Sequence, residues 1–176
     1  ETAGLAETSK TLPGRPPQLC NGCPHVDSYT SLNNAVAALV EKAGKDNVTV
    51  NADIGCYALG GAAPLNAAES IVCMGASIGM ARGASQAGVK YTFGVIGDST
   101  FLHSGITNLV DCVATKTPVT VVLLDNTIVA MTGCQPTMLP SSQFEPLVRG
   151  LGVEPEHIRV LATNPANREA NTKVLL

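Results

Sequence analysis

Two polar residues stand just beyond apolar runs of the sequence, where their oxygen atoms could bind a cation. Asp98 lies two residues after the run at 91–96, and Asn126 lies two residues after the run at 119–124. Mg²⁺ accepts carboxylate and amide oxygens, and it usually completes its shell with phosphate oxygens and water. The backbone carbonyl of Ile128, in the turn after Asn126, could add another oxygen. This spacing predicts a magnesium ion that is held by Asp98, Asn126 and Ile128 and carries a diphosphate.

The same residues have a simpler interpretation, because Asp and Asn commonly form turns at the ends of strands. A lone Gly-Asp-Ser tripeptide would favour that interpretation. Here Gly97, Asp98 and Ser99 are followed by a second apolar run and then by Asn126, and this combination favours a bound cofactor. The amides of Ser99 and Thr100, near the start of the next helix, could donate hydrogen bonds to phosphate oxygens.

Apolar periodicity predicts an α/β domain in which strands and helices alternate. We expect helices over 28–43, 75–84, 106–114 and 144–150, and strands over 48–51, 69–74, 92–96, 119–124 and 157–161. Continuous apolar runs are typical of parallel strands covered on both faces, so the expected fold is a three-layer sandwich around a mostly parallel sheet. Asp27 or Ser28 could cap the first helix after a turn-rich loop at 20–25, and Gly44 ends it.

Ligands of such sheets bind beyond the carboxyl ends of the strands. The loops at 53–57, 75–78, 97–101 and 125–133 should therefore share one edge.

Composition limits the function classes that need to be considered. The chain has 176 residues, of which 45% are hydrophobic, so we expect one domain at 19–176 after a linker or arm at 1–18 rich in Thr, Ala, Pro and Gly. The net charge is −3 and no basic run occurs, so nothing indicates nucleic acid or a membrane surface as a partner. No apolar stretch approaches the roughly 20 residues of a membrane helix.

The six cysteines are irregularly spaced. This spacing, with no signal peptide, favours a reduced, cytoplasmic setting. The chain begins at Glu1 without Met, so we expect a fragment or one half of a larger enzyme.

Five ordered segments resemble the 2-oxoacid:ferredoxin oxidoreductases, whose thiamine diphosphate motif has the form Gly-Asp-Gly/Ser followed by Asn. The segments are CNGCPH at 20–25, DIGCY at 53–57, CMGASIG at 73–79, GDSTFLHSG at 97–105 and DNTIVAMTG at 125–133. The closest resemblance is to the thiamine-diphosphate-binding region of the indolepyruvate ferredoxin oxidoreductase large subunit, and it covers about residues 15–165. It implies the diphosphate-binding type of thiamine diphosphate domain.

The resemblance also implies roles for individual residues. Asp98, Asn126 and the carbonyl of Ile128 would hold Mg²⁺. The diphosphate would be lined by Gly97, Ser99, Thr100, Met131, Thr132 and Gly133. The pyrimidine and thiazolium rings would lie near Gly75, Ala76, Ser77 and Ile78, with Cys23, His25, Gly55 and Cys56 close to the reactive carbon or the substrate. His25 and Cys56 are the catalytic candidates, and His25 could bind the substrate carboxylate or move a proton.

The activity implied is oxidative decarboxylation of a 2-oxoacid to an acyl-CoA, with electrons passed through iron–sulfur clusters to ferredoxin. The partners implied are a pyrimidine-binding domain that supplies an activating Glu, a second oxidoreductase subunit and ferredoxin, in a homo- or hetero-oligomer. No acidic residue here lies in a matching motif, and the ferredoxin-like cysteine runs are absent from the sequence. We therefore expect the clusters to lie elsewhere in the full enzyme and this chain to be inactive alone.

Two other interpretations remain open from the residues themselves. Cys20, Cys23 and His25, with Cys56 or Cys73, could bind zinc or a cluster, although no second metal-spaced pair follows. The chain could also be a non-catalytic α/β module that assembles with partners.

Overall fold

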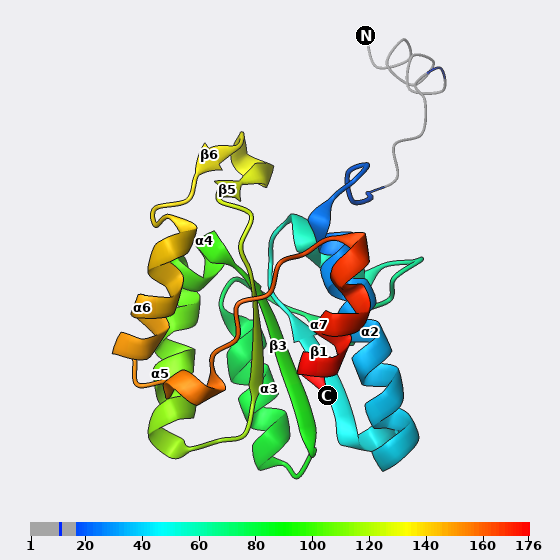
Figure 1. Ribbon diagram of the computed structural model, residues 1–176, viewed down its shortest axis with the longest axis vertical. Coiled ribbons are helices and arrows are strands. Elements are labelled where there is room, and N and C mark those ends of the chain that lie inside the picture. Colours follow the sequence, from blue (N-terminus) through cyan, green and yellow to red (C-terminus); the bar gives the residue numbers. More distant parts are fainter. Residues whose placement is uncertain (1–10, 12–16) are drawn as a thin grey trace, which may run out of the picture.

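The computed structural model describes residue 11 and residues 17–176, so the predicted arm at 1–18 lies almost wholly outside the described residues. Its centre is a four-stranded sheet in the order β2-β1-β3-β4, and every pairing is parallel (Figure 1). The strands are β1 (Val48–Ala52), β2 (Ser70–Ile71), β3 (Tyr91–Gly97) and β4 (Thr120–Leu124). The α/β class and the parallel sheet predicted from the sequence are confirmed.

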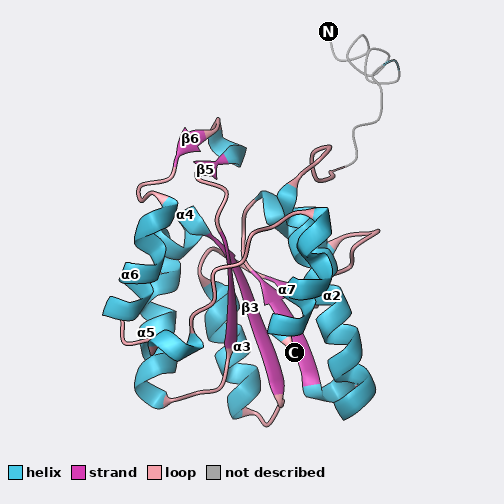
Figure 2. Ribbon diagram, in the orientation of Figure 1, coloured by secondary structure: helices cyan, strands magenta, loops and turns pink. Residues whose placement is uncertain are grey.

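Helices cover both faces of the sheet (Figure 2). They are α2 (Pro24–Ala43), α3 (Ala76–Gln86), α4 (Asp98–Thr100), α5 (Ile106–Thr115), α6 (Phe144–Gly150) and α7 (Arg168–Leu175). Side chains of β3 alternate between two apolar cores, since Phe93 and Val95 pack with α2 while Ile96 packs with α3 and α5. These two cores separate the three layers. None of the helices within the described part of the chain is long and apolar enough to cross a membrane.

The first helix begins four residues earlier than predicted, at Pro24. Proline is favoured in the first turn of a helix because its missing N–H needs no partner there. Cys23 is the N-cap residue and no side chain caps the helix, so the prediction of a cap at Asp27 or Ser28 was wrong. The turn-rich loop is correspondingly shorter, and the first turn of the helix carries His25 into the interior.

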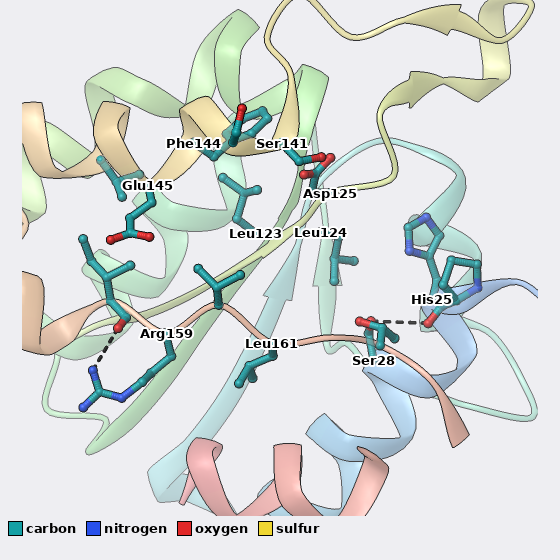
Figure 3. A pocket seen from close by; sticks show the side chains of 16 residues that line it. His25, Ser28, Leu123, Leu124, Asp125, Ser141, Phe144, Glu145, Arg159 and Leu161 are labelled. Atoms are coloured by element: carbon teal, nitrogen blue, oxygen red, sulfur yellow. Dashed lines mark hydrogen bonds between the residues drawn. The ribbon is translucent and has the colours of Figure 1, made fainter. Parts of the chain in front are cut away.

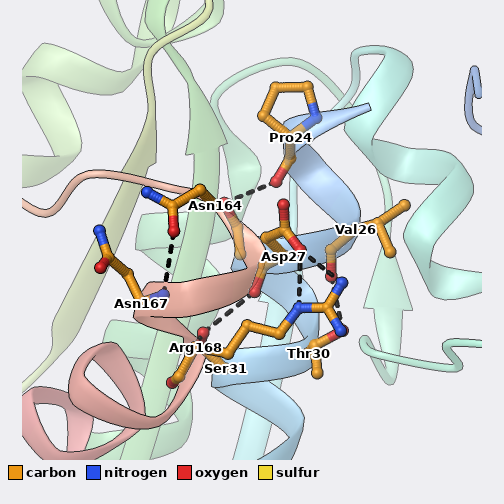
Figure 4. Close-up of polar contacts among 9 residues, drawn as sticks. Pro24, Val26, Asp27, Thr30, Ser31, Asn164, Asn167 and Arg168 are labelled. Carbon is orange, nitrogen blue, oxygen red and sulfur yellow. Dashed lines mark hydrogen bonds and ion pairs between the residues drawn. The ribbon is translucent and has the colours of Figure 1, made fainter. Parts of the chain in front are cut away.

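Helix α7 packs against α2 through polar contacts that Figure 4 shows. Arg168 pairs with Asp27, with 2.6 Å between Nε and Oδ1. The hydroxyl of Ser31 donates to the carbonyl of Arg168 at 3.2 Å, and the hydroxyl of Thr172 donates to the carbonyl of Ser31 at the same distance. These contacts fix the last helix on the layer that carries His25.

Two predicted strands differ from the structure. The strand expected at 69–74 is reduced to β2, because residues 72–74 turn away to begin α3 after Gly75 at positive φ. The strand expected at 157–161 was wrong, since residues 158–163 form no strand and His157 ends a 3-10 turn at Pro155–His157. Residues of this segment and of the end of β4 line a cavity of about 630 Å³, and among the described residues no strand pairs with the segment.

Candidate functional site

The chain passes directly from β3 into a helix at the predicted magnesium residue. Gly97 ends the strand and Asp98 is the first residue of α4, which continues through a π-helical turn at Phe101–Gly105 into α5. The loop predicted at 97–101 was therefore wrong, because the helix starts at once. A Cβ at Gly97 would collide with the ring of Tyr57, so only glycine allows this close approach.

The buried carboxylate of Asp98 joins the end of β3 to the segment that follows β4. Its Oδ1 accepts a hydrogen bond from the Ser99 amide at 2.6 Å. Its Oδ2 accepts from the amides of Thr127 at 2.7 Å and Asn126 at 3.2 Å, and from the hydroxyl of Thr137 at 3.0 Å. The two segments that the sequence singled out thus meet at one side chain.

The oxygen atoms here fit a small hard cation that shares its shell with a diphosphate. Oδ1 of Asp98 accepts only one hydrogen bond from the described residues, and Oδ1 of Asn126 accepts one, from the Ile128 amide at 3.2 Å. In the hairpin of β5 (Ile128–Val129) and β6 (Gln135–Pro136), the residue opposite Ile128 is Pro136, which has no N–H to donate to the Ile128 carbonyl. Carboxylate, amide and carbonyl oxygens are ligands that Mg²⁺ accepts.

A cavity of about 260 Å³ opens beside these oxygens, at the carboxyl end of the sheet. Of the predicted site residues, its lining includes Gly55, Cys56, Gly97, Asp98, Ser99, Thr100, Asn126, Ile128, Met131 and Thr132. Six further lining residues were missed: Ile54, Tyr57, Met74, Leu124, Val129 and Ala130. All but Leu124 lie inside the five sequence segments, so including the neighbours of each motif residue would have found them.

Seven predicted site residues do not line this cavity: Cys23, His25, Gly75, Ala76, Ser77, Ile78 and Gly133. Ser77 and Ile78 are fully buried at the start of α3, behind Gly75. The Ser77 hydroxyl is buried without a hydrogen-bond partner in the described structure. The start of α3 therefore packs behind the residues that line the cavity. In this part of the chain, Met74 is the residue that lines the cavity itself.

Tyr57 forms the floor under Gly55 and Gly97. Its hydroxyl donates to the carbonyl of Ile54 at 3.0 Å, and the hydroxyl of Thr100 donates to the same oxygen at 3.0 Å. Burial raises the pKa of Tyr57 to about 12, so the ring stays neutral at physiological pH. This contact links the loop after β1 to the helix that begins with Asp98.

The buried His25 and the partly buried Cys56 form a pair, with 3.4 Å between Nε2 and Sγ. Burial lowers the pKa of His25, and the negative charge of Asp98 opposes that shift. Burial raises the pKa of the Cys56 thiol, and the nearby Cys23 adds to the effect. Both groups are therefore neutral near pH 7, and the pair is a thiol hydrogen-bonded to an imidazole rather than a thiolate beside a cation.

The pair also separates two cavities. Cys56 lines the cavity beside Asp98, whereas His25 lines the larger one at the end of β4. Figure 3 shows His25 in that larger cavity together with Leu124 and Asp125 from the end of β4. A neutral imidazole there can accept or donate a proton, but it offers no fixed positive charge to a carboxylate.

All six cysteines are free, and within residues 17–176 no three His, Cys, Asp or Glu side chains gather in a way that could hold a metal ion. The interpretation of Cys20, Cys23 and His25 as a metal-binding motif is therefore not favoured by this structure.

Comparison with known proteins identifies the class. Residues 53–160 match the thiamine pyrophosphate enzyme family, at its C-terminal TPP binding domain, and the chain belongs to that family. The match spans the loop after β1, the start of α3, the helix that begins with Asp98 and the segment after β4. This membership favours a cofactor-binding domain over a non-catalytic assembly module.

Curated relatives narrow the resemblance. The chain is 40% identical over 166 residues to the indolepyruvate oxidoreductase subunit IorA of Methanothermobacter thermautotrophicus, covering 89% of this chain and 26% of that protein. It is 37% identical over 186 residues to the IorA subunit of Archaeoglobus fulgidus, covering 97% of this chain and 28% of that protein. The chain thus spans about a quarter of the length of the curated relatives it matches. The resemblance seen in the sequence is confirmed.

Among solved structures, a similar fold occurs in a 2-oxoglutarate:ferredoxin oxidoreductase from Magnetococcus marinus, solved with 2-oxoglutarate, coenzyme A and succinyl-CoA bound. The TM-score is 0.54 at 21% identity, over 71% of this chain and 42% of that one. At this identity the likeness supports the fold.

Proposed function

We propose that this chain is the diphosphate-binding domain of an IorA-type 2-oxoacid:ferredoxin oxidoreductase that converts an arylpyruvate such as indolepyruvate to an acyl-CoA. The observation that carries the proposal is Asp98, whose carboxylate joins the two halves of the thiamine motif beside a cavity. The identity to IorA subunits supports the substrate class. Residues 19–176 would form this domain, and residues 1–18 would be a linker or arm.

The cation and diphosphate would lie at the edge where β3 and β4 end. Asp98, Asn126 and the carbonyl of Ile128 would hold Mg²⁺, and the diphosphate would be lined by Gly97, Ser99, Thr100, Met131, Thr132 and Gly133. The Ser99 amide already donates to Asp98, and the Ser99 hydroxyl pairs with the Thr137 hydroxyl at 3.1 Å, so Ser99 would exchange one of these partners for a diphosphate oxygen. When bound, thiamine diphosphate supplies the nucleophile that adds to the keto carbon and accepts the electron pair released as CO₂ leaves.

The reacting end of the cofactor would lie on the side of Gly55 and Cys56, with Cys23 and His25 behind them. His25 would act as a proton carrier through its contact with Cys56 rather than as a carboxylate ligand, because its lowered pKa keeps it neutral. The rings would lie near the start of α3, where Gly75, Ala76, Ser77 and Ile78 support the rim of the cavity.

An apolar rim around the cavity supports a partner domain as its cover. Met131 and Met74 line the cavity and are 68% and 44% exposed, and Val72 and Met138, in the same two segments of the chain, are also exposed. Apolar patches of this kind commonly mark interaction sites. We assign the rim to the pyrimidine-binding domain that supplies the activating Glu, in a cytoplasmic homo- or hetero-oligomer. A second subunit, ferredoxin and iron–sulfur clusters elsewhere in the enzyme would complete it, with coenzyme A as acyl acceptor.

The test uses the full-length protein with its second subunit and follows reduction of a viologen dye by an arylpyruvate and coenzyme A. We expect reduction that needs both thiamine diphosphate and Mg²⁺, that is lost in Asp98→Ala, and that is kept in Asp46→Ala. Asp46 is an exposed control in the turn before β1, at the opposite edge of the sheet. Full activity of Asp98→Ala, or no cofactor-dependent oxidation of any 2-oxoacid, would overturn the proposal.

A further inference from the structure

Gly75 is held from both sides by side chains that do not line the cavity. Its amide donates to Oδ1 of Asp53 at 2.6 Å, and its carbonyl accepts from Nδ2 of Asn108 at 2.7 Å. The other oxygen of Asp53 accepts from the amide of Ser77 at 3.0 Å. Gly75, at the start of α3, is thus fixed by Asp53, which follows β1, and by Asn108 on α5.

Asp53 has no partner other than backbone among its hydrogen bonds within residues 17–176. Its side chain is 0% exposed, and its oxygens accept from the amides of Ile54, Gly75 and Ser77. A buried carboxylate needs such donors because burial otherwise penalises its charge. The amides at the N-terminus of a helix are suitable partners, since they lack intrahelical acceptors and lie at the positive end of the helix dipole. Asp53 therefore anchors α3 firmly to the end of β1.

Asn108 connects the same point to the helix that begins with Asp98. It lies on α5, and its Nδ2 also approaches the carbonyl of Ser104 at 3.4 Å. A Cβ at Gly75 would lie 2.6 Å from that Ser104 oxygen, so the two segments touch closely. The start of α3 is therefore held at a fixed position relative to α5, which continues the helix that begins with Asp98.

We propose that Asp53 and Asn108 are positioning residues, which hold the backbone at 73–76 at a fixed place beside the cavity so that it receives the ring half of bound thiamine diphosphate. The inference rests on the proposed function. Both residues act through Gly75, and Met74, the residue directly before Gly75, lines the cavity. The diphosphate half of the cofactor would contact the end of β3 and the segment after β4 instead. Loss of the Asn108 side chain should therefore weaken binding of the ring half and leave binding of the diphosphate half unchanged.

Two ligands separate these effects in the full-length protein. Thiamine diphosphate with Mg²⁺ uses the ring and diphosphate sites, whereas inorganic diphosphate with Mg²⁺ uses the second alone. For Asn108→Ala and Asn108→Asp, we expect about tenfold weaker binding of thiamine diphosphate, the size of one lost hydrogen bond. We expect unchanged binding of inorganic diphosphate and faster hydrogen exchange at the amides of Gly75 and Ser77. Asp53→Asn should likewise weaken thiamine diphosphate binding and speed hydrogen exchange at these two amides, while inorganic diphosphate binding stays unchanged.

Asn33→Asp is the matched control, because Asn33 donates through Nδ2 to the carbonyl of Leu65 at 2.7 Å, away from the cavity. It should leave both affinities and both amides unchanged. Equal weakening of both ligands in the Asn108 variants would overturn the inference, since a general loss of structure produces that result. Unchanged thiamine diphosphate affinity in those variants would also overturn it while the proposed function stands. If the wild-type protein binds inorganic diphosphate but not thiamine diphosphate, the proposed function and this inference both fail.

Discussion

Asp98 combines three tasks at the scale of a single residue. It is the first residue of a helix, it accepts amides from the segment after β4, and one of its oxygens retains capacity for another partner. Because the end of β3 and the residues after β4 share this one acceptor, the motif residues Asp98 and Asn126 keep a fixed separation. A cation added there would strengthen a junction that already exists.

Gly75 is the residue at which a single methyl group should have a large effect. Its φ is +89° and a Cβ would lie 2.6 Å from the Ser104 carbonyl oxygen, so Gly75→Ala adds a clash to the roughly 1–2 kcal/mol cost of a left-handed residue. We expect the free energy of unfolding, measured with urea, to fall by more than about 1 kcal/mol. Gly83→Ala in the same helix is the control, since nothing lies within 4 Å of its Cβ position. It should stabilise by about 0.5–1 kcal/mol, and equal effects at both positions would contradict the account.

His25 should make the stability depend on pH in the acid range. Burial lowers its pKa below the ordinary 6.5, despite the opposing charge of Asp98. As the pH falls through 6.5, the unfolded chain therefore takes up a proton before the folded chain does, and folding loses free energy. We expect the melting temperature to fall between pH 7.5 and 5.5, and to fall less in His25→Asn. The exposed His157 provides the control, because His157→Gln should leave the wild-type profile in place.

At the scale of elements, the ion pair between α2 and α7 fixes the last helix. The Arg168 and Asp27 side chains are partly exposed, so Arg168→Met should lower the free energy of unfolding by about 0.5–1 kcal/mol. Hydrogen exchange should rise first across α7. Arg149→Met removes an exposed pair on α6 whose closest atoms are 3.8 Å apart, and we expect it to change almost nothing. Equal losses in the two variants would show that the Asp27 pair has no special role.

The elements also show how far the sequence predicts this fold. The strands at the centre of the sheet and α6 could be predicted, because their apolar residues are the ones that pack into the two cores. Residues 157–161 have the same kind of apolar pattern, yet they form no strand, because strand formation depends on a partner that the pattern does not specify. Pro24 is a local signal for the start of the first helix, but nothing local indicates that the first turn carries His25 inward.

The candidate site also has a part that the sequence predicts and a part that it does not. The motif segments predicted most of the cavity lining, since their residues follow the ends of β1, β3 and β4 at one edge. The support behind that lining could not be predicted, because Asp53 and Asn108 meet Gly75 only after three separate elements pack together. Sequence motifs mark atoms that contact a ligand more readily than the side chains that hold those atoms in place.

At the scale of the whole molecule, the site is an open edge rather than an enclosed pocket. The cavity beside Asp98 is about 260 Å³, and exposed methionines stand on its rim. The chain spans about a quarter of its relatives' length. Under the proposed function a partner domain covers this site, so the full-length protein is the form in which cofactor affinity should be measured.

The most direct test is a calorimetric titration of thiamine diphosphate into the full-length protein, with and without Mg²⁺, for the wild type and Asp98→Ala. The account predicts stoichiometric binding that requires Mg²⁺ in the wild type and is lost in Asp98→Ala, while the melting curve of the variant stays cooperative. Magnesium-independent binding, or undiminished binding by Asp98→Ala, would contradict the assignment of Asp98 as the anchor of the cofactor.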